Sequence, residues 1–352
     1  MAEFERFEGM SRERLAGIIK GIGEVRAALL GDVCIDIYWS ADMTRSVLSR
    51  ETPHFPLPVT QERMSPGAGG NAAANMSALA PKSVRVAGVV GDDWRGDCLR
   101  REFARCGIDA SGLVETKGRF TNAYCKPMRR GYTGVEVEDP RLDFESYLPL
   151  THEDELKIAK NLENIARDAD VLCVSDQFEY GCVTPFIRKR LAELSGAGLR
   201  IVADSRSRIA EFSGAILKPN EIECARAVGY PGALPTKTDE DIAKVAHAAK
   251  TLAKRTASDV CVTVGARGCL VCRGGVCTFV EASPVEPPVD TVGAGDCFLS
   301  AFSLALAAGA SFPEAGFFGN LAASVSVKKL GTTGTASARE ILERYDLLRA
   351  KG

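Results

Sequence analysis

Residues 290–309 read DTVGAGDCFLSAFSLALAAG, and this stretch carries the strongest structural signal in the chain. The small residues Gly293, Ala294 and Gly295 predict a sharp turn into a helix. Backbone N–H groups of such a turn can approach an anion at the helix N-terminus. Asp296 falls at the start of the helix, where it can accept a proton from a hydroxyl beside a phosphate. The alternative is a glycine-rich turn in which Asp296 only caps the helix.

Outward from this stretch, predicted strands and helices alternate. We expect strands at 27–33, 84–90, 170–175, 199–203, 215–217 and 259–264, and a hairpin at 268–281. We expect helices at 11–28, 71–79, 94–106, 152–166, 184–195, 239–255, 295–309 and 313–328. This alternation predicts an α/β fold, a doubly wound, mostly parallel sheet flanked by helices. Ligands of such sheets bind beyond the carboxyl ends of the strands.

Two segments, at about 33–60 and 119–145, break the alternation. The first contains Pro53, Pro56 and Pro58, so we expect residues 40–65 to be irregular. The second has the alternating pattern of strands. We expect the two segments to form a small β-sheet lid over the site of a single domain, residues 1–352.

The composition excludes several classes of protein. The formal net charge is −2, with 45% hydrophobic and 26% charged residues, which is ordinary for a soluble globular protein. No overall field recruits nucleic acid or an anionic membrane, and no apolar stretch is long enough to span one. The N-terminus has no apolar signal-peptide core. We therefore expect a cytoplasmic protein with neither nucleic acid nor membrane as partner.

The twelve cysteines lie mostly inside apolar runs, so we expect buried, reduced thiols. Cys269, Cys272 and Cys277 cluster in the predicted hairpin, the first two with CxxC spacing. On a strand, residues three apart point to opposite faces, so this pair chelates a metal poorly. Strand packing is favoured over zinc or redox chemistry.

Two signatures together resemble those of the ribokinase-like (PfkB) carbohydrate kinase family. DTVGAGDCFLSAF resembles the C-terminal signature, and residues 66–75, PGAGGNAAAN, resemble the N-terminal one. The resemblance covers about residues 25–340. It implies a ribokinase-like fold, ATP as co-substrate and Mg²⁺ as cofactor. It also implies that Asp296 is the catalytic base and that the backbone N–H groups of Gly293, Ala294 and Gly295 stabilise the transferring phosphoryl group.

The resemblance also implies a nucleotide and metal site. Residues 218–223, KPNEIE, contain the family's N-x-x-E pattern, in which Asn220 and Glu223 would organise Mg²⁺ through water; alternatively, Asn220 is a helix N-cap. A monovalent cation such as K⁺ would lie near Asp290 and Thr291. The residues implied for ATP binding are Lys218, Asn220, Thr263, Gly265, Gly268 and Asn320.

On the acceptor side, the family pattern implies that Asp36, Gly70 and Asn71 contact sugar hydroxyls. The closest subgroup resembles the heptose 7-phosphate kinase domain of bacterial ADP-heptose synthesis enzymes, through residues 31–39, 48–53, 141–145 and 329–332. The implied reaction is phosphoryl transfer from ATP to a hydroxyl of a sugar or sugar phosphate, with D-glycero-D-manno-heptose 7-phosphate as a candidate. Relatives often pair their lids, which implies a homodimer.

A phosphorylated acceptor needs cations, and Arg50, Arg141, Arg206 and Arg208 are candidates because guanidinium binds phosphate bidentately. Each could equally be a solvated surface arginine. The chain departs from the subgroup at Asp204-Ser205-Arg206, where the pattern is Asp-Pro-Lys, and by an insertion at 54–55. No nucleotidyltransferase half is expected after residue 340. A kinase for an unphosphorylated sugar or a nucleoside therefore stays open.

Two other classes of protein share features with this sequence. Gly67, Gly69 and Ala72 fit the G-x-G-x-x-A pattern of nicotinamide-dependent oxidoreductases, with Asp92 downstream. Against this, no strand is expected before Gly67, because the preceding residues are polar and include Pro66. A non-catalytic sugar or nucleotide sensor is disfavoured by the presence of Asp296.

Overall fold

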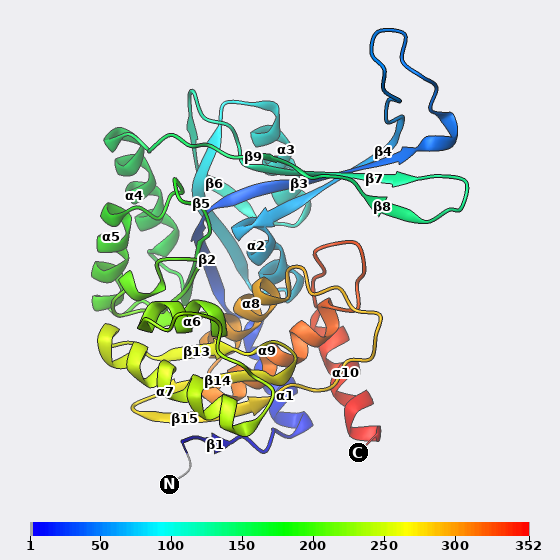
Figure 1. The fold of residues 1–352 in the computed structure, drawn as a ribbon. Coiled ribbons are helices and arrows are strands. Elements are labelled where there is room, and N and C mark those ends of the chain that lie inside the picture. The colour runs from blue at the N-terminus through cyan, green and yellow to red at the C-terminus, as the bar shows by residue number, and fades with distance from the viewer. Residues whose placement is uncertain (1–2, 352) are drawn as a thin grey trace.

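The computed structural model describes residues 3–351 and contains two sheets (Figure 1). The larger has ten strands in the order β1-β15-β14-β13-β12-β11-β10-β2-β5-β6. From β13 to β6 all neighbours are parallel, whereas β14 is antiparallel to both β13 and β15. This confirms the predicted doubly wound, mostly parallel sheet. In sheet order the strands are Glu5–Arg6, Val276–Glu281, Gly268–Arg273, Val260–Thr263, Ile216–Leu217, Ile201–Ser205, Val171–Asp176, Arg26–Gly31, Ser83–Gly91 and Asp109–Thr116.

Helices cover both faces of this sheet because successive side chains of a buried strand point to opposite sides. In β2, Ala27 and Leu29 pack in one core cluster, and Ala28 and Leu30 pack in the other. The first cluster includes α1 (Arg12–Ile22), α2 (Gly69–Ala78), α3 (Trp94–Arg105), α8 (Ala294–Ala307), α9 (Phe312–Ser326) and α10 (Ala338–Lys351). The second includes α4 (His152–Ala166), α5 (Pro185–Gly196), α6 (Glu221–Val228) and α7 (Asp239–Thr256).

The smaller sheet, here called the lid, projects from one end of the molecule (Figure 1). Its strand order is β4 (Val59–Ala68), β3 (Val33–Asp42), β7 (Ala123–Arg130) and β8 (Glu136–Glu138), and β9 (Leu142–Phe144) also pairs with β7. Apolar residues on one face, such as Ile35 and Ile37, belong to the core. The alternate residues, including Asp36 and Tyr38, form the opposite face, here called the inner face.

Two expectations about residues 40–65 need correction, because the stretch without strand or α-helix is limited to residues 43–58 and a strand leads into Gly67. Residues 59–68 form the regular strand β4, paired with β3 along almost its whole length. As β4 is at the edge of the lid, it tolerates Pro66. Gly67 is therefore preceded by a strand, contrary to expectation. That strand, however, is an antiparallel lid strand outside the parallel sheet, unlike the first strand of a dinucleotide-binding unit.

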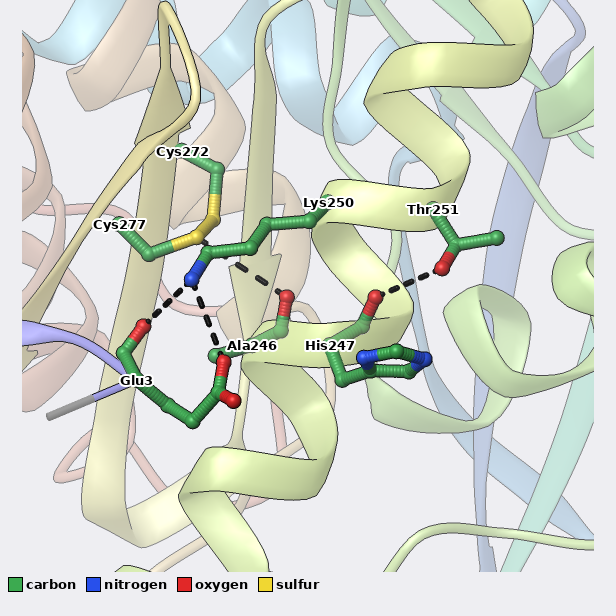
Figure 2. Close-up of a disulfide and its surroundings, with 7 residues drawn as sticks. All are labelled: Glu3, Ala246, His247, Lys250, Thr251, Cys272 and Cys277. Carbon is green, nitrogen blue, oxygen red and sulfur yellow. Dashed lines mark hydrogen bonds and ion pairs between the residues drawn. A yellow bond between two sulfur atoms is a disulfide. The ribbon is translucent and has the colours of Figure 1, made fainter. Parts of the chain in front are cut away.

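The expectation of reduced thiols is wrong for one pair, since Cys272 and Cys277 form a disulfide (Figure 2). They lie directly opposite each other in the β14–β15 register, with Cα atoms 4.1 Å apart, so their side chains share a face beside α7. Cys269 packs in the other core cluster, as its three-residue spacing from Cys272 predicts. The other ten cysteines are free, and all but Cys106 are buried.

The sequence analysis did not predict β1, β6 or α10, and it expected α6 only in the alternative reading of Asn220 as a helix N-cap. Within residues 3–351, no helix is both long and apolar enough to cross a membrane.

Candidate active site

A cavity of about 410 Å³ lies where β13 ends and α6, α8 and α9 converge. Most residues predicted to bind ATP line it: Asn220, Thr263, Gly265, Gly268 and Asn320. The turn before α8 contributes Thr291, Ala294 and Gly295. Apolar side chains such as Phe298 and Val327 complete the wall, which suits the flat apolar face of a nucleotide base. The structure thus brings these separate sequence segments together around one cavity.

The turn before α8 has backbone features that suit an anion. Gly293 is the N-cap at φ +78°, a left-handed conformation that favours glycine. A Cβ there would lie 2.8 Å from the side-chain nitrogen of Asn71. No side chain caps this end of α8, although the Ala294 N–H bonds Thr291 O within the turn. The N–H groups that follow are therefore directed toward the cavity side with the helix dipole behind them.

Asp296 lies in the first turn of α8, half-buried, and does not cap the helix. Its Oδ2 accepts a 2.7 Å hydrogen bond from Asn71 Nδ2. Asn75 Nδ2 in turn donates to Asn71 Oδ1, which orients that amide. Burial, helped by the nearby carboxylate of Asp204, raises the pKa of Asp296 to about 7, and the hydrogen bond from Asn71 opposes this shift. A carboxyl group that titrates near neutrality is suited to accept a proton during turnover.

On the inner face of the lid, Asp36 points toward the same region and contributes to raising the pKa of Asp296. Asp36 is buried, and burial raises its own pKa against the attraction of Lys126. Lys126 Nζ donates to Asp36 Oδ2 at 3.0 Å and to the Tyr38 hydroxyl at 2.9 Å. The sequence analysis missed Lys126. In the sequence, Lys126 differs from its neighbours only in being a charged residue between the apolar residues Cys125 and Pro127.

Two glycines of the N-terminal signature have packing reasons. At Gly67 a Cβ would lie 2.5 Å from Asp36 Oδ1, so only glycine leaves Asp36 in its place. At Gly70 a Cβ would lie 3.0 Å from Pro66 and 3.3 Å from Phe103, so this residue allows α2 to approach the lid. Gly70 and Asn71 are both buried in the first turn of α2.

The predicted arginines separate into different environments. Arg141 forms a bidentate ion pair with Asp143 and lies 4.3 Å from the Tyr124 ring centroid, and its charge acts on Asp36. Arg206 is exposed, and its charge acts on Tyr124 and Glu223.

The other two predicted arginines have different surroundings again. Arg208 is held in an ion pair with the fully buried Asp176, so its guanidinium supports the fold. Arg50 is exposed in the segment 43–58, which extends away from the body of the molecule (Figure 1).

Asn220 is the N-cap of α6, as the alternative reading of its motif expected. Its Oδ1 accepts from the N–H groups of Ile222 and Glu223, and Glu223 Oε2 accepts from the Asn220 N–H at 2.9 Å. Burial raises the pKa of Glu223, and the neighbouring Asp204 carboxylate raises it further. Lys218 is buried beside them, 3.6 Å from Asp204. Lys218 therefore offsets only part of the negative charge of Asp204 and Glu223, and within residues 3–351 only one of the two Glu223 oxygens accepts a hydrogen bond. Such a pair of carboxylates fits a hydrated Mg²⁺.

Asp290, predicted with Thr291 to lie near a monovalent cation, stabilises the turn before α8 through hydrogen bonds. Asp290 Oδ1 accepts from the Val292 N–H at 3.0 Å, and its Oδ2 accepts from the Gly331 N–H at 3.1 Å. Asp290 thus ties the turn before α8 to the loop at 331–333. Asn320 donates its amide N–H to Val280 O at 2.9 Å, which fixes its orientation in the cavity wall.

Comparison with known proteins agrees with this geometry. The profile of the family described as "pfkB family carbohydrate kinase" matches residues 32–339. The bifunctional protein HldE of Geobacter sulfurreducens is 31% identical over 345 residues, covering 97% of this chain and 67% of that protein. HldE of Desulfatibacillum aliphaticivorans is 29% identical, covering 87% of this chain and 60% of that protein. The chain thus spans about two thirds or less of these relatives' length.

Solved structures share the fold. A ribokinase from Arabidopsis thaliana, solved with ribose and ATP, superposes with a TM-score of 0.67 at 20% identity, over 91% of this chain and 98% of that one. Phosphofructokinase-2 from Escherichia coli, solved with substrates and products, gives 0.69 at 22% identity, over 92% and 100%. Together with the family match, these findings leave no place for a nicotinamide-dependent oxidoreductase. The chain belongs to the pfkB family of carbohydrate kinases and is an ATP-dependent kinase.

Proposed function

We propose that the protein transfers the γ-phosphoryl group of ATP to a hydroxyl of a phosphorylated sugar. The first acceptor to test is D-glycero-D-manno-heptose 7-phosphate. One observation carries the proposal: Asp296, with its pKa near 7, lies between the nucleotide cavity and the polar inner face of the lid. The matched segments that resemble heptose 7-phosphate kinases, and the curated relatives named HldE, support the choice of acceptor.

In the proposed mechanism, Asp36 and Asn71 orient the acceptor so that one hydroxyl faces Asp296. Asp296 takes the proton of that hydroxyl while its oxygen forms a bond to the γ-phosphorus, and the bond to the β-phosphate oxygen breaks to release ADP. The backbone N–H groups at the start of α8 stabilise the negative charge on the transferring group. Mg²⁺, held through water near Asn220 and Glu223, would neutralise phosphate charge.

The test is ADP release from Mg-ATP with a panel of sugars, sugar phosphates and nucleosides, alongside Asp296→Asn. We expect turnover with the heptose 7-phosphate in the parent protein and a loss of about 10²–10⁴-fold in the variant. Turnover only with an unphosphorylated acceptor would refute the substrate class but keep the kinase. If ATP binds but no acceptor is turned over, a sensor role would replace the proposal.

We also propose a homodimer joined through the lid, a cytoplasmic location, where ATP is available, and a requirement for K⁺. The dimer is supported by exposed apolar side chains on the segment between β3 and β4: Val47, Leu48, Phe55 and Leu57. For K⁺ the support is the position of Thr291 in the cavity wall beside the anion-binding turn. Phosphofructokinase-2 of Escherichia coli has been solved in complex with potassium.

A further inference from the structure

A second hollow, of about 390 Å³, lies between the inner face of the lid and the loop at Gly331. Its walls include Tyr38, Ser40, Gln61, Arg63 and Met128 from three neighbouring lid strands. The nucleotide cavity and this hollow have no lining residue in common. The hollow is therefore available to a group other than ATP.

This hollow begins one inner-face position away from Asp36. Along β3, Asp36, Tyr38 and Ser40 point the same way, at intervals of about 7 Å. An acceptor with one hydroxyl at Asp296 and others at Asp36 would extend along this row, past Tyr38. The spacing of about 7 Å between Asp36 and Tyr38, which lines the hollow, is comparable with the length of one sugar unit. The far end of a sugar phosphate would therefore reach the hollow.

A row of cations crosses the lid at Tyr38. The register places Arg63 on β4 and Lys126 on β7 directly opposite Tyr38 on either side. The Arg63 guanidinium lies 4.0 Å and Lys126 Nζ 4.6 Å from the centre of the Tyr38 ring. The charge of Lys126 is already matched by Asp36, at 3.0 Å. Arg63 also acts on the Asp36 carboxylate, but from beyond ion-pair distance, so the two cations of this row share one carboxylate.

The contacts of Arg63 are to neutral oxygens. Its guanidinium donates to Thr332 Oγ1 at 3.0 Å and to Gly331 O at 2.8 Å. Within residues 3–351, no carboxylate lies within ion-pair distance of it. A guanidinium carries five N–H donors, and these two bonds leave three for a ligand. Arg141, by contrast, already has two N–H groups on Asp143.

Two carboxylates also line the hollow, and neither neutralises Arg63. Glu62 alternates to the opposite face of the lid, where it accepts from the Trp39 indole at 2.7 Å. Glu136 lies opposite Arg130, four residues along β7 from the Lys126 row, or about 13 Å. The end of the hollow beside Tyr38 therefore has a net positive charge.

We propose that this hollow is the subsite for the acceptor's own phosphate group, and that Arg63 is the residue that binds it. The proposal rests on the proposed function and names the residue that distinguishes phosphorylated from unphosphorylated acceptors. Asp36 and Asp296 hold the reacting end of the sugar, and Arg63 holds the other. None of the arginines chosen from the sequence has this position.

The first test compares Arg63→Gln with the matched control Arg129→Gln, using steady-state kinetics on a phosphorylated acceptor and its unphosphorylated counterpart. Arg129 lies on β7 at a position that alternates to the other face, paired with Asp139 at 3.0 Å. We expect Arg63→Gln to raise KM for the phosphorylated acceptor about 10- to 100-fold, with kcat little changed. KM for the unphosphorylated one should not change, and Arg63→Lys should recover part of the loss. A purely structural role would raise KM for both acceptors equally and would overturn the proposal.

The second test does not depend on turnover. Inorganic phosphate is titrated calorimetrically into protein saturated with Mg²⁺ and a non-hydrolysable ATP analogue, so that the nucleotide's own phosphate sites are filled. We expect the parent protein and Arg129→Gln to bind phosphate alike, and Arg63→Gln to bind it at least tenfold more weakly. Equal binding by all three proteins, or none by the parent, would overturn the subsite. If phosphate binds as expected but no sugar phosphate is turned over, only the proposed function fails.

Discussion

At the scale of single residues, the surroundings of the buried carboxyl groups set their pKa values, and that of Asp296 is brought close to neutral pH. Asp296 loses hydration where α8 begins, and the carboxylate of Asp204 disfavours its ionised form. Asn71 and Lys218 oppose this. The balance keeps a base that is half ionised near neutral pH, instead of one fully ionised and weakly basic.

A pH dependence follows from this balance. In the proposed mechanism the ionised form of Asp296 is the base, and this form predominates above its pKa of about 7. We expect kcat/KM for the acceptor to level off above about pH 7 and to fall about tenfold per unit below it. Asn71→Ala removes a hydrogen bond that favours the ionised form, so its midpoint should move to higher pH.

Measuring the pH profiles of the parent protein and of Asn71→Ala also distinguishes the titration of Asp296 from that of the substrate. Titration of an acceptor phosphate would give the same midpoint in both proteins. A profile without a break near neutrality, or identical midpoints in both proteins, would contradict the role of Asp296.

The signature residues could be predicted from the sequence, but their partners could not. Asp296, Asn71 and Asp36 stand in contiguous motifs, so a pattern finds them. The neighbours of Lys126 and Arg63 are determined by the register of β7 and β4 against β3, which the sequence does not show. A lysine or arginine in a strand has no signal that identifies which carboxylate or ring it will face. The same holds for Arg208, which follows β11 and pairs with Asp176 at the end of β10.

At the scale of elements, the lid strands place the acceptor residues, and Gly67 on β4 sets the position of Asp36 on β3. We expect Gly67→Ala to displace the Asp36 carboxylate, since the added Cβ would lie 2.5 Å from its oxygen. This should lower kcat/KM for the acceptor about 10- to 100-fold and leave ATP binding unchanged.

The matched control is Gly131→Ala, in the turn between β7 and β8, where an added Cβ meets nothing within 4 Å. Kinetics with each substrate varied in turn measure both variants. An unaltered acceptor KM and kcat in Gly67→Ala would show that Asp36 is not positioned by this contact.

The β14–β15 hairpin supplies a second prediction at this scale. Unreduced protein denatured in guanidinium should expose ten thiols to Ellman's reagent, and twelve after reduction. Replacing both Cys272 and Cys277 by Ser should lower the free energy of unfolding by about 2 kcal/mol, as expected for closing so short a loop. Cys106→Ser, which removes a half-buried free thiol, is the control. Finding twelve thiols without reductant would refute the disulfide.

For the whole molecule, the alternation of strands and helices was enough to predict the fold class, because both faces of a parallel sheet must be covered. The lid was harder to predict. Its strands β4 and β8 are polar and lie at sheet edges, so they lack the apolar alternation that identifies a half-buried strand. Pro66 added a false signal, since proline is excluded from central strands but not from an edge.

The proposed dimer is a prediction at this scale. Light scattering during gel filtration should give twice the 37.6 kDa mass of one chain. The double variant Leu48→Glu/Phe55→Glu places charges on side chains that are 57% and 61% exposed, so it should weaken association without lowering the melting temperature. Val276→Glu, on the β14–β15 hairpin and 52% exposed, is the control. A parent protein that elutes as a monomer at micromolar concentration would rule the dimer out.

The bond between Asn71 and Asp296 joins residues 225 positions apart, and Ser300 Oγ donates to Ala72 O beside it. Its consequence concerns synthesis and folding, because loops of this length close late relative to local helices. During translation, α2 emerges long before α8 exists, so the base cannot acquire its surroundings until almost the whole domain has left the ribosome. In refolding, recovery of activity should therefore coincide with the slowest structural phase, and a partly folded chain would have no competent site with which to waste ATP.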